Sequence, residues 1–453
     1  MEQNRGNFGS RLASILVAAG SAVGLGNIWR FPYELGRNGG SAFLIIYIMC
    51  VVFFGVPLMI SEFAVGRHAQ SNTARAFGMM GGSRYWRWVG FLGVLTGSLI
   101  LCYYAVAAGW TVEYLFLAGV DGFAGKTPEQ FATDFNSFVS DPVQPIVCMI
   151  VFMLLTLFVI LAGVEKGIER GSKLMMPMLF IFIVLLAVGS SMLPNGEQGL
   201  EFLFSPDLSK VTRSTLLSAM GQAFYSLSLS MGCLATYASY FRREDRLVSN
   251  AMNVAWIDLL VAVLASVIIF PAAFSVGVEP GVGPSLVFIT LPNVFQQVFA
   301  GSPLLCYAFS LMFYLLLVLA ALTSAMGLLE VPTIFMKEEF HIRRRWSAIG
   351  VTLFAIVVGM ACSLSMGLWS GFKIAGMNLF DTFDFFTAKI MLPVGGFFAA
   401  LYVGWFCDEP TLRGEVTNEG TTAVRFYPIY RFLIRYIAPL AILAIFLNQF
   451  GLI

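Results

Sequence analysis

Eleven separate stretches of about 20 mostly apolar residues limit what this chain can fold into, since each is long enough to cross a bilayer as a helix. They cover residues 11–33, 41–65, 88–118, 145–162, 174–193, 216–240, 249–275, 303–335, 347–365, 379–406 and 429–450. Only 12% of the 453 residues are charged, against about 25% in a soluble domain. The sequence therefore predicts an all-α membrane protein with eleven transmembrane helices embedded in a lipid bilayer. It excludes a soluble enzyme and, with a net charge of +1, a nucleic-acid-binding protein.

Basic residues are distributed unevenly between the two sides of the expected helix bundle. Cytoplasmic loops of membrane proteins are enriched in lysine and arginine. If the N-terminus is cytoplasmic, about three quarters of the 27 basic residues lie on the inner side. We therefore expect a multi-pass protein of the cell membrane whose N-terminus is cytoplasmic and whose C-terminus, after eleven spans, is extracytoplasmic.

Two of the apolar stretches carry small and polar residues at their midpoints. The first reads Gly20-Ser-Ala-Val-Gly-Leu-Gly-Asn27, and the sixth reads Ser226-Leu-Ser-Leu-Ser-Met-Gly232. Small residues at such positions also occur where two helices simply pack closely. Matched breaks in the first helices of two halves favour instead an inverted-repeat transporter, whose unwound backbone lines a cavity. Residues 1–453 would then form one transporter domain, with repeats at about 11–193 and 216–406 and an extra helix at about 429–450.

The run from Arg11 to Pro32, which contains the first break, and the following Asn38-Gly-Gly40 resemble the neurotransmitter:sodium symporter family. Further matches are Gly55-Val-Pro57, Glu62, Tyr103-Tyr104, Gln222-Ala-Phe224, Thr236-Tyr-Ala-Ser-Tyr240, Ile289-Thr-Leu-Pro292, Leu322-Thr-Ser324, Asp381 and Asp384. The resemblance, from about residue 5 to 450, is to prokaryotic amino-acid transporters with the leucine-transporter-like fold, an inverted repeat of five plus five helices with helices 1 and 6 broken. It implies secondary transport rather than enzymatic catalysis. Because the chain lacks the family's twelfth span, we expect a monomer or a weak dimer.

The resemblance places a small-molecule amino-acid substrate between the two breaks. Free backbone N–H groups near Gly24 and Gly26 would bind its carboxylate, and free carbonyls near Ala22 and Tyr225 would bind its ammonium group. Relatives that carry monoamines have aspartate at the position of Gly24, so glycine there favours an amino acid. The expected substrate-binding residues are Ala22, Gly24, Gly26, Ile100, Tyr104, Ala107, Tyr225, Ser226, Ser228, Met231, Ser324 and Leu328.

The side chains of this expected site include no charged residue, so a charged substrate side chain would remain unpaired. We therefore expect sodium-coupled uptake, by symport and alternating access, of apolar aliphatic and aromatic L-amino acids. A membrane sensor that binds the amino acid without transporting it is the alternative that the sequence leaves open.

Two sodium ions are implied, because hard cations prefer carbonyl, hydroxyl and carboxylate oxygens. The first would be bound by the substrate carboxylate, which couples the two ligands, and by Ala22, Asn27, Ser226 and Asp258. The second would be bound by the carbonyls of Gly20, Val23 and Ala320 and the hydroxyls of Thr323 and Ser324. These two hydroxyls also fit a simpler role, in which they bond the preceding turn of their own helix.

The resemblance also assigns gates and supporting residues. The outer path would be closed by Arg30 and Asp384 above Tyr225, and the inner path by Arg5, Tyr240 and Glu338. Exposed ion pairs contribute roughly 0–1 kcal/mol, which suits a gate that must open. The supporting residues are Glu62, which would hold freed backbone at the breaks, and Gly167 with Pro177, which would let the fifth helix unwind. Pro177 also fits a simpler role as the mark of an early helical turn.

Animal members of the family require chloride beside the first sodium ion. The serine that coordinates this chloride corresponds to Ala262, one helical turn beyond Asp258, and Asp258 itself replaces a neutral asparagine. The fixed carboxylate would supply the missing negative charge, so we expect no chloride requirement. Once the sodium ion leaves, an unpaired buried carboxylate is costly and takes up a proton. Proton counter-transport is therefore a secondary hypothesis.

Overall fold

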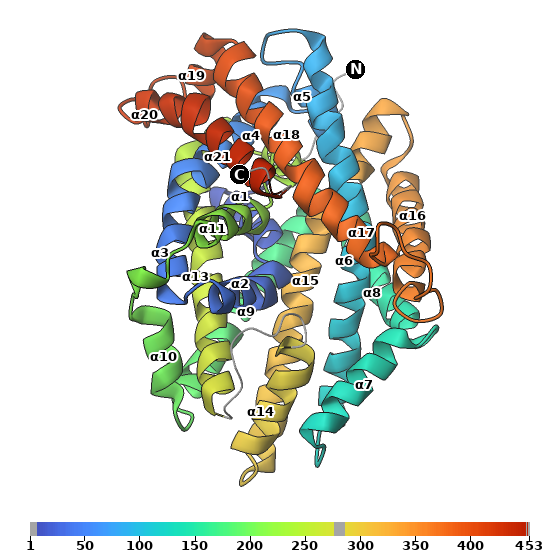
Figure 1. Ribbon diagram of the computed structural model, residues 1–453. Helices are drawn as coiled ribbons and strands as arrows, with labels where there is room; N and C mark the ends of the chain where they lie inside the picture. The colour runs from blue at the N-terminus through green and yellow to red at the C-terminus, as the bar shows by residue number, and fades with distance from the viewer. Residues whose placement is uncertain (1–6, 276–285, 450, 452–453) are drawn as a thin grey trace.

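The computed structural model describes residues 7–275, 286–449 and 451, and every regular element in these ranges is a helix (Figure 1). This confirms the expected all-α class. Long helices cross the bundle, while short helices collect at its two ends: α5, α19 and α20 at one end of the view, and α7, α10 and α14 at the other.

The long apolar helices are often composite, with α-helical parts joined through wider or tighter turns (η). Their bounds are α1 (Arg11–Ala22), η1 (Gly26–Arg30), α2 (Phe31–Arg37), α3 (Ser41–Cys50), η2 (Val51–Gly55), α4 (Val56–Ala69), η3 (Arg84–Trp86), α6 (Arg87–Gly119), α8 (Gln144–Leu161), η4 (Val164–Glu169), α9 (Arg170–Ser191), α11 (Arg213–Ser226), α12 (Cys233–Ala238), α13 (Leu247–Ser275), α15 (Pro303–Glu339), α16 (Arg344–Leu364), α17 (Leu379–Phe386), η7 (Thr387–Met391), α18 (Leu392–Leu401), η8 (Tyr402–Phe406), α20 (Tyr427–Phe432), η9 (Leu433–Ile437) and α21 (Ala438–Gln449).

Within the described ranges, nine continuous helices have the length and hydropathy of a membrane span, and the bent pair formed by α1 with η1–α2 makes a tenth. The remaining expected span, the sixth in chain order at residues 216–240, consists of α11 and α12 with six non-helical residues between them. Neither part is long enough to span a membrane by itself.

The first break lies at the expected glycines. Ser10 caps α1 by accepting a hydrogen bond from the Ala13 N–H, and Val23 ends the helix in an extended conformation (φ −70°, ψ 110°). The Gly24 N–H then bonds the Asn27 side chain, so the Gly20 carbonyl lacks its helical partner. The chain turns by 55° between α1 and the η1–α2 segment.

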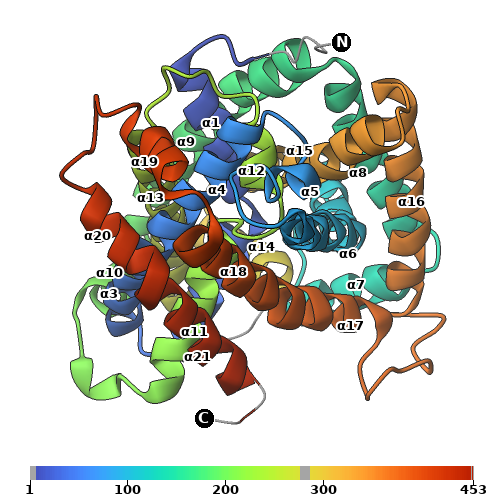
Figure 2. The ribbon, with the colours of Figure 1, turned by 90° about the horizontal axis from the view of Figure 1, so that it is seen from above.

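The second break lies at the expected serines. Ser228 and Ser230 adopt positive φ angles of 52° and 63°, and Gly232 begins α12 with a φ of 77°. A left-handed backbone conformation is unfavourable for serine, so surrounding contacts must hold it in place. Figure 2 shows α1, α4 and α12 grouped near the middle of the bundle, whereas α16 and α20 lie at its edge.

Several short elements lie outside the expected spans. The stretch 286–299, between the seventh and eighth expected spans, contains η6 (Leu286–Thr290) and α14 (Leu291–Val298). The others are absent from the sequence-based expectation because they lack a long apolar run: α5 (Thr73–Ala76), α7 (Pro128–Ser140), α10 (Gly196–Phe204), η5 (Leu208–Lys210) and α19 (Glu409–Thr417).

Candidate binding site between the broken helices

A small cavity lies where the two breaks face each other. It contains about 410 Å³ of empty space and is lined by Ser21, Ala22, Gly24, Leu25, Gly26, Asn27, Ile100, Tyr104, Tyr225, Ser226, Ser228, Met231, Ser324 and Leu328. Eleven of the twelve residues expected to bind substrate are among these. The exception is Ala107, which is buried about one helical turn beyond Tyr104 on α6 and does not line the cavity.

The cavity wall combines apolar side chains with exposed backbone polarity. The hydroxyl of Ser228 donates to the Ser21 carbonyl at 3.0 Å, which ties the two breaks together. The hydroxyl of Tyr104 lies 3.4 Å from the Ala321 carbonyl, a long contact for a hydroxyl donor. None of the lining side chains is charged. The cavity therefore suits a molecule whose charged groups are bound by backbone N–H and carbonyl groups.

Asp258 is fully buried on α13, and three donors surround its carboxylate. Asn27 Nδ2 donates to Oδ1 at 2.7 Å, while the hydroxyls of Ser226 and Tyr47 donate to Oδ2 at 2.8 and 3.2 Å. In the described part of the chain, no basic side chain acts on this carboxylate. A buried carboxylate without a basic partner is expensive, and a cation bound here would neutralise it.

Asn27 has one feature that the sequence did not predict. Its amide oxygen accepts the Gly24 N–H at 3.0 Å, and its amino group faces Asp258 and Ser226. In this orientation the amino group of Asn27 lies nearest the Asp258 carboxylate, and the amide oxygen occupies the Gly24 N–H.

Five oxygen atoms from α1 and α15 form a second polar cluster. Thr323 Oγ1 lies 3.0 Å from the Ala320 carbonyl and 3.5 Å from that of Val23. Ser324 Oγ lies 3.0 Å from the Val23 carbonyl and 3.5 Å from that of Gly20. Two hydroxyl protons cannot satisfy this many acceptors, so the arrangement fits a hard cation. Thr323 also contacts the Leu319 carbonyl of its own helix at 3.1 Å, as the simpler role requires.

Glu62 holds the second break. This residue of α4 is buried, and its Oε1 accepts the N–H of Ser230 at 2.6 Å. Ser230 is one of the two serines with a positive φ. The carboxylate thus satisfies a backbone donor that the interruption of the helix sets free, which is the supporting contact expected from the sequence.

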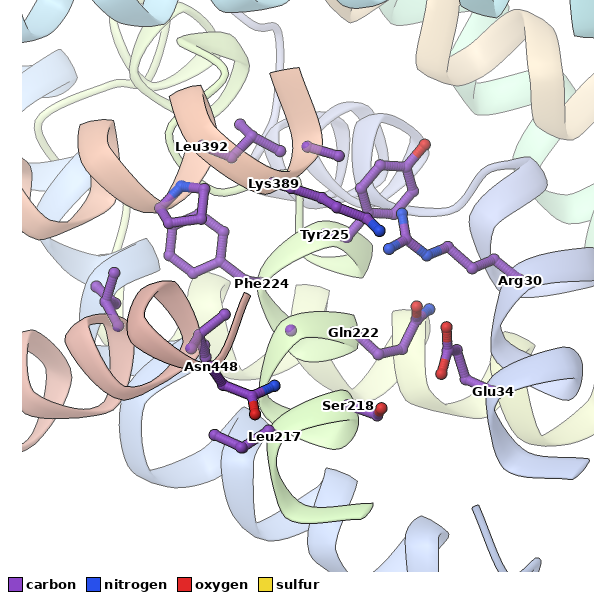
Figure 3. A pocket seen from close by; sticks show the side chains of 15 residues that line it. Arg30, Glu34, Leu217, Ser218, Gln222, Phe224, Tyr225, Lys389, Leu392 and Asn448 are labelled. Carbon is purple, nitrogen blue, oxygen red and sulfur yellow. The ribbon is translucent and has the colours of Figure 1, made fainter. Parts of the chain in front are cut away.

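One side of the cavity, the expected outer side, is covered by an aromatic ring and a cation. The guanidinium carbon of Arg30 lies 4.3 Å from the centre of the Tyr225 ring. Beyond the ring lies a larger pocket of about 900 Å³, into which Arg30, Glu34, Gln222 and Lys389 project (Figure 3). The expected partner Asp384, in α17, forms no direct ion pair with Arg30 within the described residues. Arg30 stacks on Tyr225 instead.

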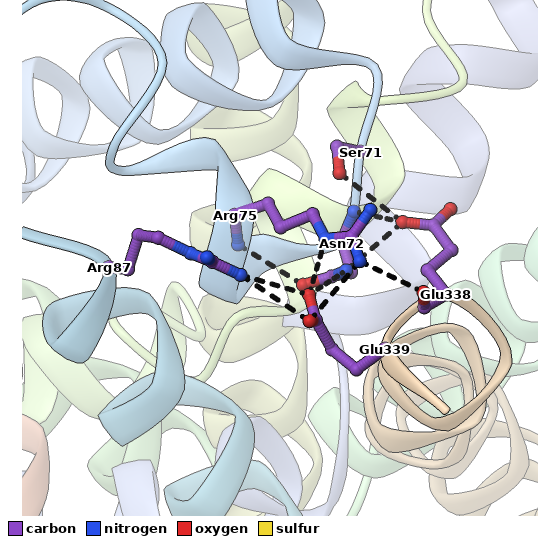
Figure 4. A network of polar contacts seen from close by, with 6 residues as sticks. All are labelled: Ser71, Asn72, Arg75, Arg87, Glu338 and Glu339. Atoms are coloured by element: carbon purple, nitrogen blue, oxygen red, sulfur yellow. Dashed lines mark hydrogen bonds and ion pairs between the residues drawn. The ribbon is translucent and has the colours of Figure 1, made fainter. Parts of the chain in front are cut away.

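Two residues of the expected inner gate, Tyr240 and Glu338, contact other polar side chains within the described ranges. Tyr240 donates its hydroxyl proton to Glu330 at 2.7 Å, and Glu330 forms a two-pronged ion pair with Arg344 at 2.7 Å for each contact. This pair was not expected from the sequence, although Glu330 lies in one apolar span and Arg344 lies just before the next. Glu338 accepts hydrogen bonds from Ser71 and Asn72 (Figure 4). Arg5 lies outside the described residues.

The two residues expected to let the fifth helix unwind lie in η4 and α9. Gly167 packs so closely on α8 that an added Cβ would meet the Val159 carbonyl oxygen. Pro177 lies inside α9, well past the first helical turn. Because proline has no N–H, the carbonyl of Lys173 lacks its helical partner. This position does not match the simpler role of marking an early turn.

Two interrupted helices that enclose a cavity at their breaks, with oxygen clusters beside it, are the architecture of secondary transporters with discontinuous helices. The family model described as "Sodium:neurotransmitter symporter family" matches residues 5–128 and 129–452. The chain therefore belongs to the sodium:neurotransmitter symporter family. It is a multi-pass membrane transporter of a sodium-dependent family and not an enzyme.

Known proteins resemble this chain over its full length. It is 35% identical to the sodium-dependent transporter YhdH of Bacillus subtilis, covering 100% of this chain and 99% of the relative. It is 31% identical to a sodium-dependent transporter of Haemophilus influenzae, covering 99% and 98%. A crystal structure of MhsT in complex with L-phenylalanine superposes with a TM-score of 0.90 at 39% identity, covering 98% of this chain and 100% of MhsT.

Proposed function

We propose that this protein couples the uptake of apolar aliphatic and aromatic L-amino acids to sodium by alternating access. The observation that carries the proposal is the uncharged cavity between two broken helices, with a buried carboxylate on one side and a cluster of five oxygens on the other. The related MhsT structure contains L-phenylalanine, an amino acid of the class that such a cavity accepts.

Two sodium ions are part of this proposal. One would lie beside Asp258 with Asn27, Ser226 and the Ala22 carbonyl, and it would also contact the substrate carboxylate. The other would lie among the oxygens of Gly20, Val23, Ala320, Thr323 and Ser324. A ligand shared between the first ion and the substrate makes each bind better when the other is present.

Chloride is not needed in the proposed cycle. Asp258 supplies a fixed negative charge, and the side chain of Ala262, one turn along the same helix, cannot coordinate an anion. Release of sodium would leave the buried carboxylate without a cation, so return of the empty transporter in a protonated form belongs to the same hypothesis.

The proposal also includes the membrane topology and the gates. α11 and α12 together would form the sixth of eleven spans, with the two repeats and the extra C-terminal helix as expected from the sequence. The N-terminus would be cytoplasmic, the C-terminus extracytoplasmic, and the protein a monomer or a weak dimer in the cell membrane. Arg30, Tyr225 and Asp384 would close the outer path, and Arg5, Tyr240 and Glu338 the inner path.

Uptake into proteoliposomes tests the function directly. Purified protein is reconstituted with an inward sodium gradient, and labelled phenylalanine or leucine is followed with all common amino acids as competitors. We expect saturable uptake that requires sodium, that persists when gluconate replaces chloride, and that apolar amino acids inhibit. Sodium-dependent binding without flux would identify a sensor instead, and loss of uptake in gluconate would refute the role given to Asp258.

A further inference from the structure

A cluster of aromatic residues surrounds one arginine at the outer edge of the bundle. It lies where η8, the last turn of the span 379–406, meets η9 in the span 427–448. Figure 2 shows α20 and α21 at the margin of the molecule. An added Cβ on Gly404 would lie 3.1 Å from the Arg435 Cα, so the two helices approach closely here. The indole N–H of Trp405 donates to the Arg435 carbonyl at 3.1 Å.

The Arg435 guanidinium has an aromatic platform but no anion. Its central carbon lies 3.9 Å from the centre of the Trp405 ring and 5.9 Å from that of Tyr436. In the described ranges no carboxylate lies within ion-pair distance of it, and its Nε is buried without a hydrogen-bond partner. The Nε of Arg431, one turn earlier, is also buried without a partner, but the rest of that guanidinium bonds the Val403 carbonyl at 2.6 Å and lies 3.7 Å from Glu409.

The surrounding rings mark the depth of this site in the membrane. Trp405 and Tyr436 are 47% and 44% exposed, and Phe406 and Phe432 are 52% and 54% exposed. Exposed Trp and Tyr side chains gather at the level of the lipid headgroups. Trp405 is the penultimate residue of its apolar span, and Arg435 lies beside it. Arg435 is the ninth residue of the span 427–448, and its long side chain lets the guanidinium reach the headgroup level that Trp405 marks.

We propose that Arg435 binds the phosphate of an anionic phospholipid. A planar guanidinium presents paired N–H donors that match phosphate oxygens, and stacking on Trp405 fixes its orientation. A phosphodiester is the anion present at this depth in every bilayer, and basic residues near the surface favour anionic lipids. Lipid binding at η8 and η9 would join the end of the span 379–406 to the first half of the span 427–448, apart from the substrate cavity.

Native mass spectrometry of the delipidated full-length protein tests this proposal. The protein is titrated with phosphatidylglycerol and, separately, with phosphatidylcholine. Arg435→Gln is compared with Arg435→Lys and with a control, Arg243→Gln. The control removes an exposed arginine that is distant from Arg435 in the sequence. A melting curve of each variant confirms that it is folded.

We expect Arg435→Gln to weaken phosphatidylglycerol binding about fivefold, because one basic residue near an anionic surface contributes roughly 1 kcal/mol. Arg435→Lys should lose less, because it keeps the charge, and Arg243→Gln should match the parent. Phosphatidylcholine has the same phosphodiester but no net charge, so it should bind the parent more weakly than phosphatidylglycerol and lose less affinity in Arg435→Gln. An equal loss in Arg243→Gln, or no loss in Arg435→Gln, would overturn the site. Displacement of the lipid by millimolar inorganic phosphate would show an anion site that does not select a lipid.

Discussion

At the scale of single residues, Gly24 decides which charge the cavity accepts. An added Cβ at this position would meet the Ser324 hydroxyl and lie 3.4 Å from the Tyr104 hydroxyl. Any side chain here therefore fills space that the substrate would use, and a charged one also changes the electrostatics. A test of Gly24 must separate these two effects.

Gly24→Asp should abolish amino-acid binding, and Gly24→Asn serves as a neutral control of the same size. Two like charges about 4 Å apart repel by about 4 kcal/mol at an effective dielectric constant near 20. This energy corresponds to a roughly thousandfold loss of affinity for the amino acid. Binding of labelled phenylalanine by scintillation proximity measures both variants. If Asp and Asn weaken binding equally, the steric effect alone explains the loss, and an affinity of Gly24→Asp within tenfold of the parent contradicts the placement.

The double variant Thr323→Ala, Ser324→Ala tests the second sodium ion. Each hydroxyl bonded to a charged group contributes about 1.5 kcal/mol or more, so losing two should weaken sodium binding about a hundredfold. The sodium concentration for half-maximal uptake measures this change, with Ser363→Ala, on α16, as a control hydroxyl. Unchanged sodium dependence would leave the two hydroxyls with only their bonds to the preceding helical turn.

The pair Asp258→Asn, Ala262→Ser tests how the charge beside the first ion is supplied. Removing the fixed carboxylate should lower sodium affinity in gluconate, and the new serine should let chloride restore it. Asp258→Asn alone provides the matched control, because it loses the charge without gaining the serine. Sodium-dependent uptake is measured with and without chloride. Equal uptake of the double variant in both media would show that chloride does not replace the Asp258 carboxylate.

At the scale of elements, α9 carries a proline where a regular helix would carry an N–H. Pro177 is exposed and lies inside the helix, so its ring packs against little and its effect is on the backbone. η4 precedes α9 and packs on α8 through Gly167. The weakened backbone and the tight contact at the start of this span fit a segment that opens as one unit.

Pro177→Ala should stabilise α9, by up to about 3 kcal/mol, and slow the release of sodium to the inside. Turnover should fall while the sodium affinity from outside stays the same. Transport currents or counterflow rates measure the turnover and the release of sodium. Leu174→Ala, on the same exposed face of α9, is the control. A turnover equal to that of the parent would reduce Pro177 to a tolerated interruption.

At the scale of the whole molecule, one buried arginine joins three distant segments at one end. Arg67 of α4 donates to the Asp245 carbonyl in the loop after α12 and bonds Glu415 of α19 at 2.7 Å. His68 lies 3.4 Å from the other oxygen of Glu415. Although burial opposes ionisation, the contacts with His68 and Arg67 lower the pKa of Glu415 below its usual value.

Glu415→Gln should therefore destabilise the protein by about 1–3 kcal/mol at neutral pH, because a buried donor loses its charged partner. A lowered folded-state pKa gives stability that is present above the unfolded value, near 4.3, and that disappears as the pH falls through the folded value. The difference in melting temperature between parent and variant should shrink below about pH 4.3. A difference that stays constant down to pH 3 would show that Glu415 acts through packing.

The sequence by itself determined the number of apolar stretches, the two breaks and nearly all residues of the cavity wall. These are local properties: a run of apolar residues, a cluster of glycines or serines, and a motif with fixed spacing. Each of these features can be interpreted without knowledge of distant residues, because it depends on helix geometry and on backbone hydrogen bonds that the lipid cannot satisfy.

Only the tertiary structure decided which polar groups meet. Asn27 and Asp258 are 231 residues apart in the chain and 2.7 Å apart in space, and the orientation of the Asn27 amide follows from its Gly24 contact. Arg30 stacks on Tyr225 instead of pairing with Asp384, and Tyr240 bonds Glu330, which itself pairs with Arg344. Such choices depend on side-chain directions across packed helices, where a shift of one helical turn exchanges one partner for another. Residue type and spacing along the chain do not contain that information.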